Sequence, residues 1–217
     1  MLSTLIEVFT YWGMPQNIQV DNCLPFVVPA RDTPTPLLLW LVGMGIEVHR
    51  IRPYRPTDNA VVERMQGVTY RWAEPFNCQT VEQLNTNLEQ ACLINREQYP
   101  CSRLNGKTRA ASYPKLLEGG RPFDPHGFEL QRVLDFLAKG VWVRKTGKRG
   151  VMSFCSQLWN LTVKYKYRHV YVHLDPKANE WVISLDKAVE IKRIKNTIIT
   201  EKKILNLDIQ PKNRNQI

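Results

Sequence analysis

Apolar residues follow two kinds of spacing along the first half of the chain. Leu2, Leu5, Ile6 and Phe9 recur at helical spacing and predict a helix that ends before Gly13. Similar patterns predict helices at 37–43, from residue 59 onward and at 81–95, and strands at 17–20 and 46–51. Asp58 or Thr57 is expected to cap the helix near residue 59, and Thr80 the next one. Alternating strands and helices with short connections predict an α/β fold.

Short apolar stretches separated by turn residues dominate the second half. Residues 141–145 and 151–154 flank the sequence Thr-Gly-Lys-Arg-Gly and predict a hairpin with a basic turn. Further strands are expected at 161–163, 169–174 and 180–185. Five short strands at this spacing predict a small β-barrel. The basic residues after 187 are expected to leave the barrel as a helix or a loose end.

Positive charge is concentrated in the second half. The 217 residues include 30 Lys+Arg and 20 Asp+Glu, a formal net charge of +10. Up to Gly120 there are 11 residues of each sign, whereas the remainder has 19 basic and 9 acidic residues. This asymmetry is typical of a polyanion-binding module attached to a balanced domain, because Lys and Arg neutralise phosphates. A basic surface that aids solubility is the open alternative.

Cysteine usage and hydropathy exclude several protein classes. The five cysteines are scattered without a Cys-x-x-Cys motif, so neither a disulfide framework nor a zinc ribbon is expected, and a cytoplasmic location is favoured. The longest apolar run, Leu37 to Met44, is far shorter than the roughly 20 residues of a membrane span. No membrane partner is therefore expected. His169 and His173 share one strand face, but without a third ligand nearby they do not favour a zinc site.

Two acidic residues occur in a distinctive context. Asp21 ends the predicted strand at 17–20 and is followed by Asn22, and Glu63 lies on a predicted helix in the block Pro-Thr-Asp-Asn-Ala-Val-Val-Glu-Arg. In this order the two blocks resemble the second and third acidic motifs of DDE recombinases, the retroviral-integrase-like transposases of bacterial insertion sequences. The resemblance covers about residues 1 to 115, and Cys23 stands where the family usually has Gly.

The resemblance implies an RNase H-like catalytic core that cleaves and joins DNA. Asp21 and Glu63 would bind Mg²⁺ or Mn²⁺, because hard oxygen ligands suit these ions and a metal pair activates the attacking group. The family has a further Asp on an earlier strand, whereas Glu7 is the only acidic residue before Asp21 and lies on a predicted helix. We therefore expect an N-terminally truncated core that is inactive alone. The open alternative is a turn cap at Asp21 and a solvated helix residue at Glu63.

Basic residues in both halves, together with Asn59, are candidates for DNA contacts, and surface salt bridges are the alternative for the arginines near Glu63. In the barrel, tyrosines are interleaved with the cations, which is typical of a surface that follows a nucleic-acid backbone. Burial in the barrel core is the alternative for these aromatic residues. The candidates are Arg52, Arg55, Asn59, Arg64, Arg71, Lys145, Lys148, Arg149, Lys164, Lys166 and Arg168.

The predicted organisation is a truncated integrase-like core at 1–115, a linker at 116–135, a basic SH3-like β-barrel at 136–190 and a basic tail at 191–217. Expected partners are DNA, as element ends and target, and further copies of the chain or a full-length transposase. In a bacterium this implies association with the nucleoid. Two other functions stay open: a non-catalytic DNA-binding protein that inhibits a transposase, and a basic RNA-associated protein.

Overall fold

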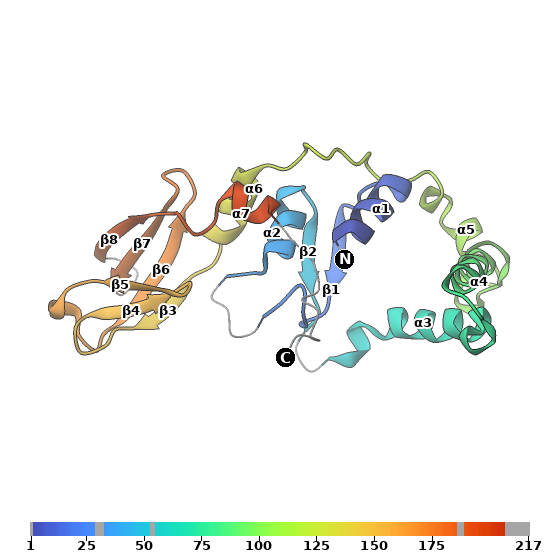
Figure 1. Cartoon of the computed structure of the whole chain (residues 1–217), viewed down its shortest axis with the longest axis horizontal. Helices are drawn as coiled ribbons and strands as arrows, with labels where there is room; N and C mark the ends of the chain where they lie inside the picture. Colours follow the sequence, from blue (N-terminus) through green and yellow to red (C-terminus); the bar gives the residue numbers. More distant parts are fainter. Residues whose placement is uncertain (1, 29–32, 53–54, 186–188, 207–217) are drawn as a thin grey trace. The chain divides into compact units, whose positions relative to one another are not determined.

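The computed structural model describes residues 2–28, 33–52, 55–185 and 189–206 of a mixed α/β protein (Figure 1). The chain divides into two compact units: unit 1 joins Met1–Arg50 to Phe123–Ile217, and unit 2 is Ile51–Pro122. Unit 2 is therefore an insertion in the sequence of unit 1. Among the described helices, none has the length and apolar composition that crossing a bilayer requires.

The first part of unit 1 confirms the helices and strands predicted there. In chain order these are α1 (Leu2–Trp12), β1 (Asn17–Val20), α2 (Pro36–Gly43) and β2 (Glu47–Arg50). β1 and β2 pair in parallel, from Asn17 opposite Glu47 to Val20 opposite Arg50. A parallel pair needs a crossover connection, and α2 lies in that connection.

Helix α2 is buried at every position after Pro36. Thr35 caps its first turn, because the threonine Oγ1 accepts a hydrogen bond from the Leu38 N–H at 3.3 Å. A helix with no polar face must be covered on all sides. On one side, Phe9 of α1 stacks on Trp40 with ring centroids 6.2 Å apart.

Two later helices, α6 (Leu130–Ala138) and α7 (Glu201–Leu205), also pack against α2. α6 buries Val133, Leu134 and Leu137, and α7 buries Ile204. Just before α6, the Glu129 N–H donates to the Gly43 carbonyl at 3.0 Å. α6 begins within the predicted linker and α7 lies in the predicted tail. Both complete the core around the buried helix.

The rest of unit 1 contains two antiparallel sheets, with the strand order β3-β6-β7-β8 in one and β4-β5 in the other. Within the described residues these strands do not close on themselves, so the predicted barrel is wrong. The strand bounds are β3 (Trp142–Lys145), β4 (Val151–Phe154), β5 (Gln157–Asn160), β6 (His169–Asp175), β7 (Glu180–Leu185) and β8 (Val189–Lys195).

The predicted hairpin between 141–145 and 151–154 is also wrong. β3 pairs with β6, with Lys145 opposite His169, and β4 pairs with β5. Cys155 and Ser156 connect β4 to β5 with φ angles of 50° and 61°. Positive φ at both central residues is the geometry of a tight hairpin turn whose twist matches that of the strands. The strand expected at 161–163 does not form, because β5 ends at Asn160 and a 3-10 turn spans Val163–Tyr165.

Aromatic side chains connect the two sheets. Trp181 on β7 is completely buried and lies edge-on to Phe154 on β4, with ring centroids 5.0 Å apart. Trp159 on β5 and Trp142 on β3 contact the same indole, at 6.5 and 5.6 Å. This packing buries apolar side chains of both sheets, although within the described residues no strand of one sheet pairs with a strand of the other. The sheets can therefore form one core and still not make a barrel.

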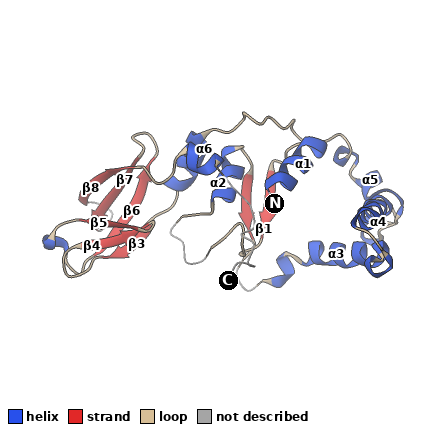
Figure 2. Cartoon of the chain, in the orientation of Figure 1, coloured by secondary structure: helices blue, strands red, loops and turns tan. Residues whose placement is uncertain are grey.

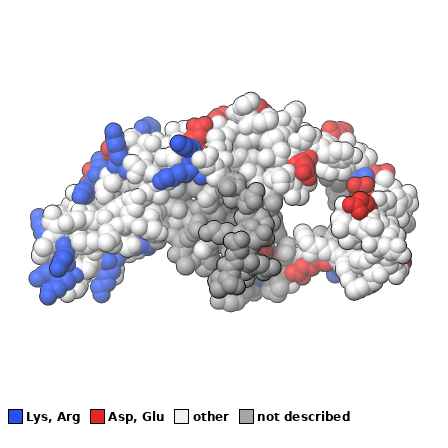
Figure 3. Space-filling view, in the orientation of Figure 1, with Lys and Arg blue, Asp and Glu red and all other residues white. Residues whose placement is uncertain are grey.

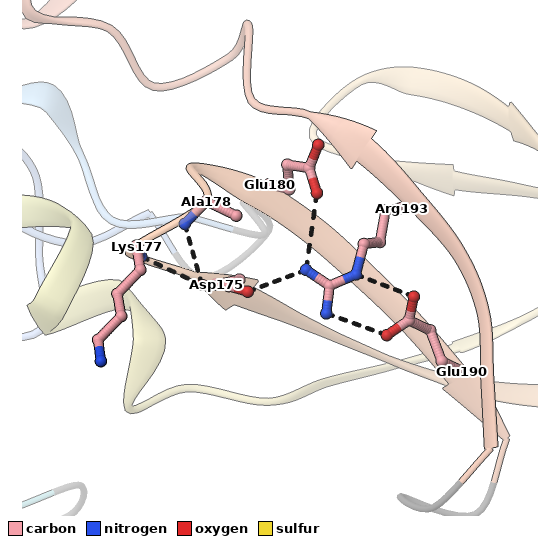
Figure 4. Close-up of polar contacts among 6 residues, drawn as sticks. All are labelled: Asp175, Lys177, Ala178, Glu180, Glu190 and Arg193. Carbon is pink, nitrogen blue, oxygen red and sulfur yellow. Dashed lines mark hydrogen bonds and ion pairs between the residues drawn. The ribbon is translucent and has the colours of Figure 1, made fainter.

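The described part of the predicted basic tail contains residues 191–195 of β8 and the helix α7, and residues 207–217 of that tail lie outside the described residues. On β8, Arg193 forms ion pairs with Asp175 (Nη1 to Oδ2, 2.9 Å), Glu190 (Nε to Oε1, 2.9 Å) and Glu180 (Nη1 to Oε2, 3.6 Å) (Figure 4). Its guanidinium hydrogen bond holds the pKa of Asp175 below the ordinary range. Hydrogen bonds to Glu190 and then Asp175 raise the pKa of Arg193. The positive charge of Arg193 is thus balanced locally.

The ion pairs of Arg193 predict that the effect of Arg193→Met on the stability of the fold depends on pH. A carboxyl whose pKa is lower in the folded state than in the unfolded state stabilises the fold at pH values above its unfolded pKa of about 3.9. This stabilisation is lost as the pH falls through the pKa of the folded state. We expect the variant to melt at a lower temperature than the parent at pH 7, with the difference shrinking below about pH 4. Thermal melts followed by circular dichroism across this range measure it. A difference that stays constant with pH would contradict the assignment.

Unit 2 is built from helices, of which the α-helices are α3 (Ala60–Ala73), α4 (Val81–Leu93) and α5 (Arg109–Ser112) (Figure 2). Thr80 caps α4 as predicted, accepting from the Gln83 N–H at 3.2 Å. The predicted capping of α3 by Asp58 or Thr57 is wrong. The N-cap residue is Asn59, whose side chain makes no capping hydrogen bond.

Unit 2 buries few side chains. Among its described residues only Ala73, Ala91 and Asn95 are buried, and Phe76 is 89% exposed. The main apolar core of the protein is made from residues of unit 1. Helix contacts within unit 2 are therefore made largely by half-buried side chains.

Candidate nucleic-acid interface

The two acidic candidates lie in different units. Asp21 directly follows β1 in unit 1 and is exposed, and its Oδ1 accepts a hydrogen bond from the Cys23 N–H at 3.3 Å. Glu63 is an exposed residue in the first turn of α3 in unit 2. Asp21 thus makes the contact of a turn cap, the alternative given by the sequence. A shared catalytic site for the two carboxylates stays a prediction.

The described residues offer no ready metal centre. In the ranges that the structure describes, no three His, Cys, Asp or Glu side chains come together closely enough to hold a metal ion. Mg²⁺ and Mn²⁺ need several oxygen ligands around one point. The residues present within either unit do not fit that requirement, and no catalytic step follows from them.

The candidate DNA-contact residues near Glu63 in the sequence differ in their surroundings. Arg52 binds Asp58 through two hydrogen bonds, Nε to Oδ2 at 2.9 Å and Nη2 to Oδ1 at 2.7 Å. Its side-chain hydrogen bond lowers the pKa of Asp58, and the same bond raises the pKa of Arg52. Arg71 donates from Nε to the Gly67 carbonyl at 3.2 Å. Arg55 and Arg64 are exposed, and Asn59 is half-buried. For Arg52 the structure shows the salt bridge that was the alternative to a phosphate contact.

The six basic candidates of unit 1 are all exposed and come from two segments, 145–149 and 164–168. In Figure 3, Lys and Arg side chains gather over the end of unit 1 that carries β3, β4 and β5. We call this set the basic surface; it consists of Lys145, Lys148, Arg149, Lys164, Lys166 and Arg168.

Thr146 holds the two segments of the basic surface together. It is 1% exposed, and its N–H donates to the Arg168 carbonyl at 2.9 Å. Its Oγ1 accepts from the Arg168 N–H at 2.9 Å and donates to the carbonyl of Tyr165. A buried hydroxyl with these partners fixes the local backbone, because breaking either bond leaves a polar group unpaired. The cations of both segments therefore project from one rigid backbone frame.

Lys148 and Arg149 occupy the tip of a turn that glycines make possible. The Gly147 N–H donates to the Val151 carbonyl at 2.8 Å and the Gly150 N–H to the Gly147 carbonyl at 3.0 Å. Gly150 has a φ of 70°, and a Cβ there would lie 1.7 Å from the Thr162 carbonyl oxygen. Only glycine fits this close approach. The turn is thus pressed against the segment that leads to the second group of cations.

The positive charge of the basic surface is not balanced within the described part of the chain. There, none of its six side chains forms an ion pair with a carboxylate, in contrast to Arg193 and Arg52. The ammonium of Lys164 lies 5.7 Å from the centre of the Tyr165 ring, a cation–π contact that leaves its charge in place. The surface therefore concentrates charge that an external anion can neutralise.

Sequence reasoning found the cations but missed the residues that bring them together. Thr146 and Gly150 belong to the Thr-Gly-Lys-Arg-Gly sequence, whose pattern predicts the connection of one hairpin. A buried threonine has no distinct signature in a single sequence.

No protein-family model matches the chain.

Proposed function

We propose that this chain acts in DNA transposition or integration as part of a DDE recombinase, and that the basic surface of unit 1 binds the DNA backbone. The observation that carries DNA binding is the group of six exposed cations without carboxylate partners on the frame held by Thr146. The family assignment is supported by the ordered Asp21 and Glu63 blocks. Catalysis within the family would need metal ligands beyond those that either unit gathers.

Binding through phosphates follows from the chemistry of the basic surface. Each Lys or Arg that neutralises a phosphate releases condensed counterions, so affinity falls as salt rises. Phosphate contacts position a protein on DNA without reading its sequence. We therefore expect the basic surface to bind DNA of many sequences with similar affinity.

The triple variant Lys145→Gln, Lys148→Gln and Arg149→Gln tests this proposal. We expect it to bind duplex DNA more weakly than the parent and to reduce the slope of log affinity against log salt by about 0.9 for each lost phosphate contact. Filter-binding titrations at several salt concentrations measure both.

The matched control replaces Arg103, Lys107 and Lys115 by Gln, which removes the same charge from exposed positions of unit 2. If both triple variants lose affinity equally, net charge rather than the basic surface causes binding. Unchanged affinity in the first triple variant would refute the proposal.

A further inference from the structure

Tyr167 has an unusual position on the basic surface. It lies between the exposed cations Lys166 and Arg168, and its own side chain is 58% exposed. Its φ is 57°, in the left-handed region that bulky residues other than glycine rarely adopt. This conformation has to be imposed by the surrounding structure.

Hydrogen bonds on both sides of Tyr167 impose it. The Tyr167 N–H donates to the Gly147 carbonyl at 3.4 Å, and the next N–H, that of Arg168, donates to Thr146 Oγ1 at 2.9 Å. The tyrosine backbone is thus tied to the turn that carries Lys148 and Arg149. The exposed residue is therefore held on a backbone that is bonded to this turn, between Lys166 and Arg168 in the sequence.

The alternative role of an aromatic residue here is packing in the core, and other aromatic residues of unit 1 have this role. Trp159 and Trp181 are buried, and Tyr165 is half-buried against the core. Tyr167 is not part of this core and is 58% exposed. Exposing an aromatic ring in a fixed, strained backbone has no packing benefit, which points to a ligand with a flat face.

We propose that Tyr167 stacks on an unpaired nucleobase, so that the basic surface binds single-stranded DNA more tightly than duplex DNA. This inference rests on the proposed DNA binding and adds the strand state of the DNA. In a duplex the base faces are covered by their neighbours, whereas in a single strand each base has a free face. Lys166 and Arg168 on either side would then contact the phosphates that flank the stacked base.

A replacement that removes the ring without straining the backbone tests the proposal. Tyr167→Asn does this because asparagine tolerates the left-handed region, and Tyr167→Phe keeps the ring. We expect the Asn variant of the full chain to lose about tenfold in affinity for an oligothymidylate of about 15 nucleotides. We expect its affinity for a duplex of the same length and its salt slope to stay unchanged, because no charge is removed. The Phe variant should bind as the parent does.

Stacking itself has a direct signal. A single 2-aminopurine in the oligonucleotide loses fluorescence when an aromatic ring stacks on it, and we expect this quenching with the parent and the Phe variant but not with the Asn variant. Tyr113→Asn, at a 54% exposed tyrosine of unit 2, is the matched control and should quench as the parent does.

The outcomes separate this inference from the proposed function. If the parent binds DNA with a salt slope that the lysine and arginine replacements reduce, but Tyr167→Asn leaves single-strand affinity and quenching unchanged, the stacking inference is wrong and DNA binding stands. Duplex binding as tight as single-strand binding would also overturn the inference. If the parent binds neither form, both proposals fail.

Discussion

Trp181→Ala is expected to lower the free energy of unfolding by about 3–5 kcal/mol, the usual cost of truncating a buried aromatic residue. Trp181 is completely buried and its ring contacts three other aromatic side chains. The indole N–H also donates to Asn196 Oδ1 at 3.2 Å. The replacement therefore opens a cavity where the two sheets meet and removes a buried hydrogen bond.

Urea unfolding of the full chain, followed by far-UV circular dichroism, measures this loss. Tyr11→Ala is the control, because Tyr11 is also an aromatic residue of unit 1 but is 78% exposed. Its replacement should cost less than about 1 kcal/mol. If Trp181→Ala cost no more than the control, the aromatic cluster would not be the core that connects the sheets.

Gly150→Ala is expected to lower the free energy of unfolding by at least about 2 kcal/mol and to weaken DNA binding. A left-handed backbone alone costs about 1–2 kcal/mol for a residue with a Cβ. In addition, the new Cβ would overlap the Thr162 carbonyl oxygen at 1.7 Å, and backbone on both sides would have to move. This movement separates the turn with Lys148 and Arg149 from the 164–168 segment. The density of positive charge on the basic surface is then lower, and DNA binds more weakly.

The matched control for this change is Gly147→Ala in the same turn. A Cβ at Gly147 would lie 3.7 Å from its nearest neighbour, the Val151 carbonyl oxygen, which is an ordinary contact. Urea unfolding and DNA titration of both variants compare the two positions. Equal effects at both glycines would show that the close approach at Gly150 does not hold the turn in place.

The elements of the first half could be predicted from the sequence because their apolar periodicity is strong. α1, β1, α2, β2, α3 and α4 all lie where the spacing placed them. The strand pairing of the second half could not be predicted, because alternation along a strand shows which face is buried but not which strand is its partner. Cys155 and Ser156 adopt positive φ without the Gly or Asn that normally marks such a turn.

Two further elements were missed for physical reasons. β8 is rich in Lys, Arg and Glu because it is an edge strand of its sheet, and its composition is that of a solvated tail. α6 is amphipathic but follows a stretch rich in Gly and Pro, which indicated a linker. Its apolar face is explained by packing against α2 and β6, which are both distant from it in the sequence.

The sequence predicts which residues give the basic surface its charge, but not how the fold brings them together. Positive charge after Gly120 is visible in the sequence, and all six basic candidates of unit 1 are exposed. That Lys148 and Arg168 belong to one surface depends on the hydrogen bonds of Thr146, which join residues far apart in the sequence. The pairing of Asp21 with Glu63 stays a prediction, since each residue belongs to a different unit.

The distribution of unit 1 over both ends of the sequence affects how the protein is made. A ribosome synthesises the chain from its N-terminus. The apolar helix α2 therefore emerges long before α6 and α7, which pack against it. Contacts between segments this far apart also form slowly. Until α6 and α7 emerge, the nascent chain therefore carries a hydrophobic helix that α1 covers only in part, and we expect it to depend on chaperones over that interval.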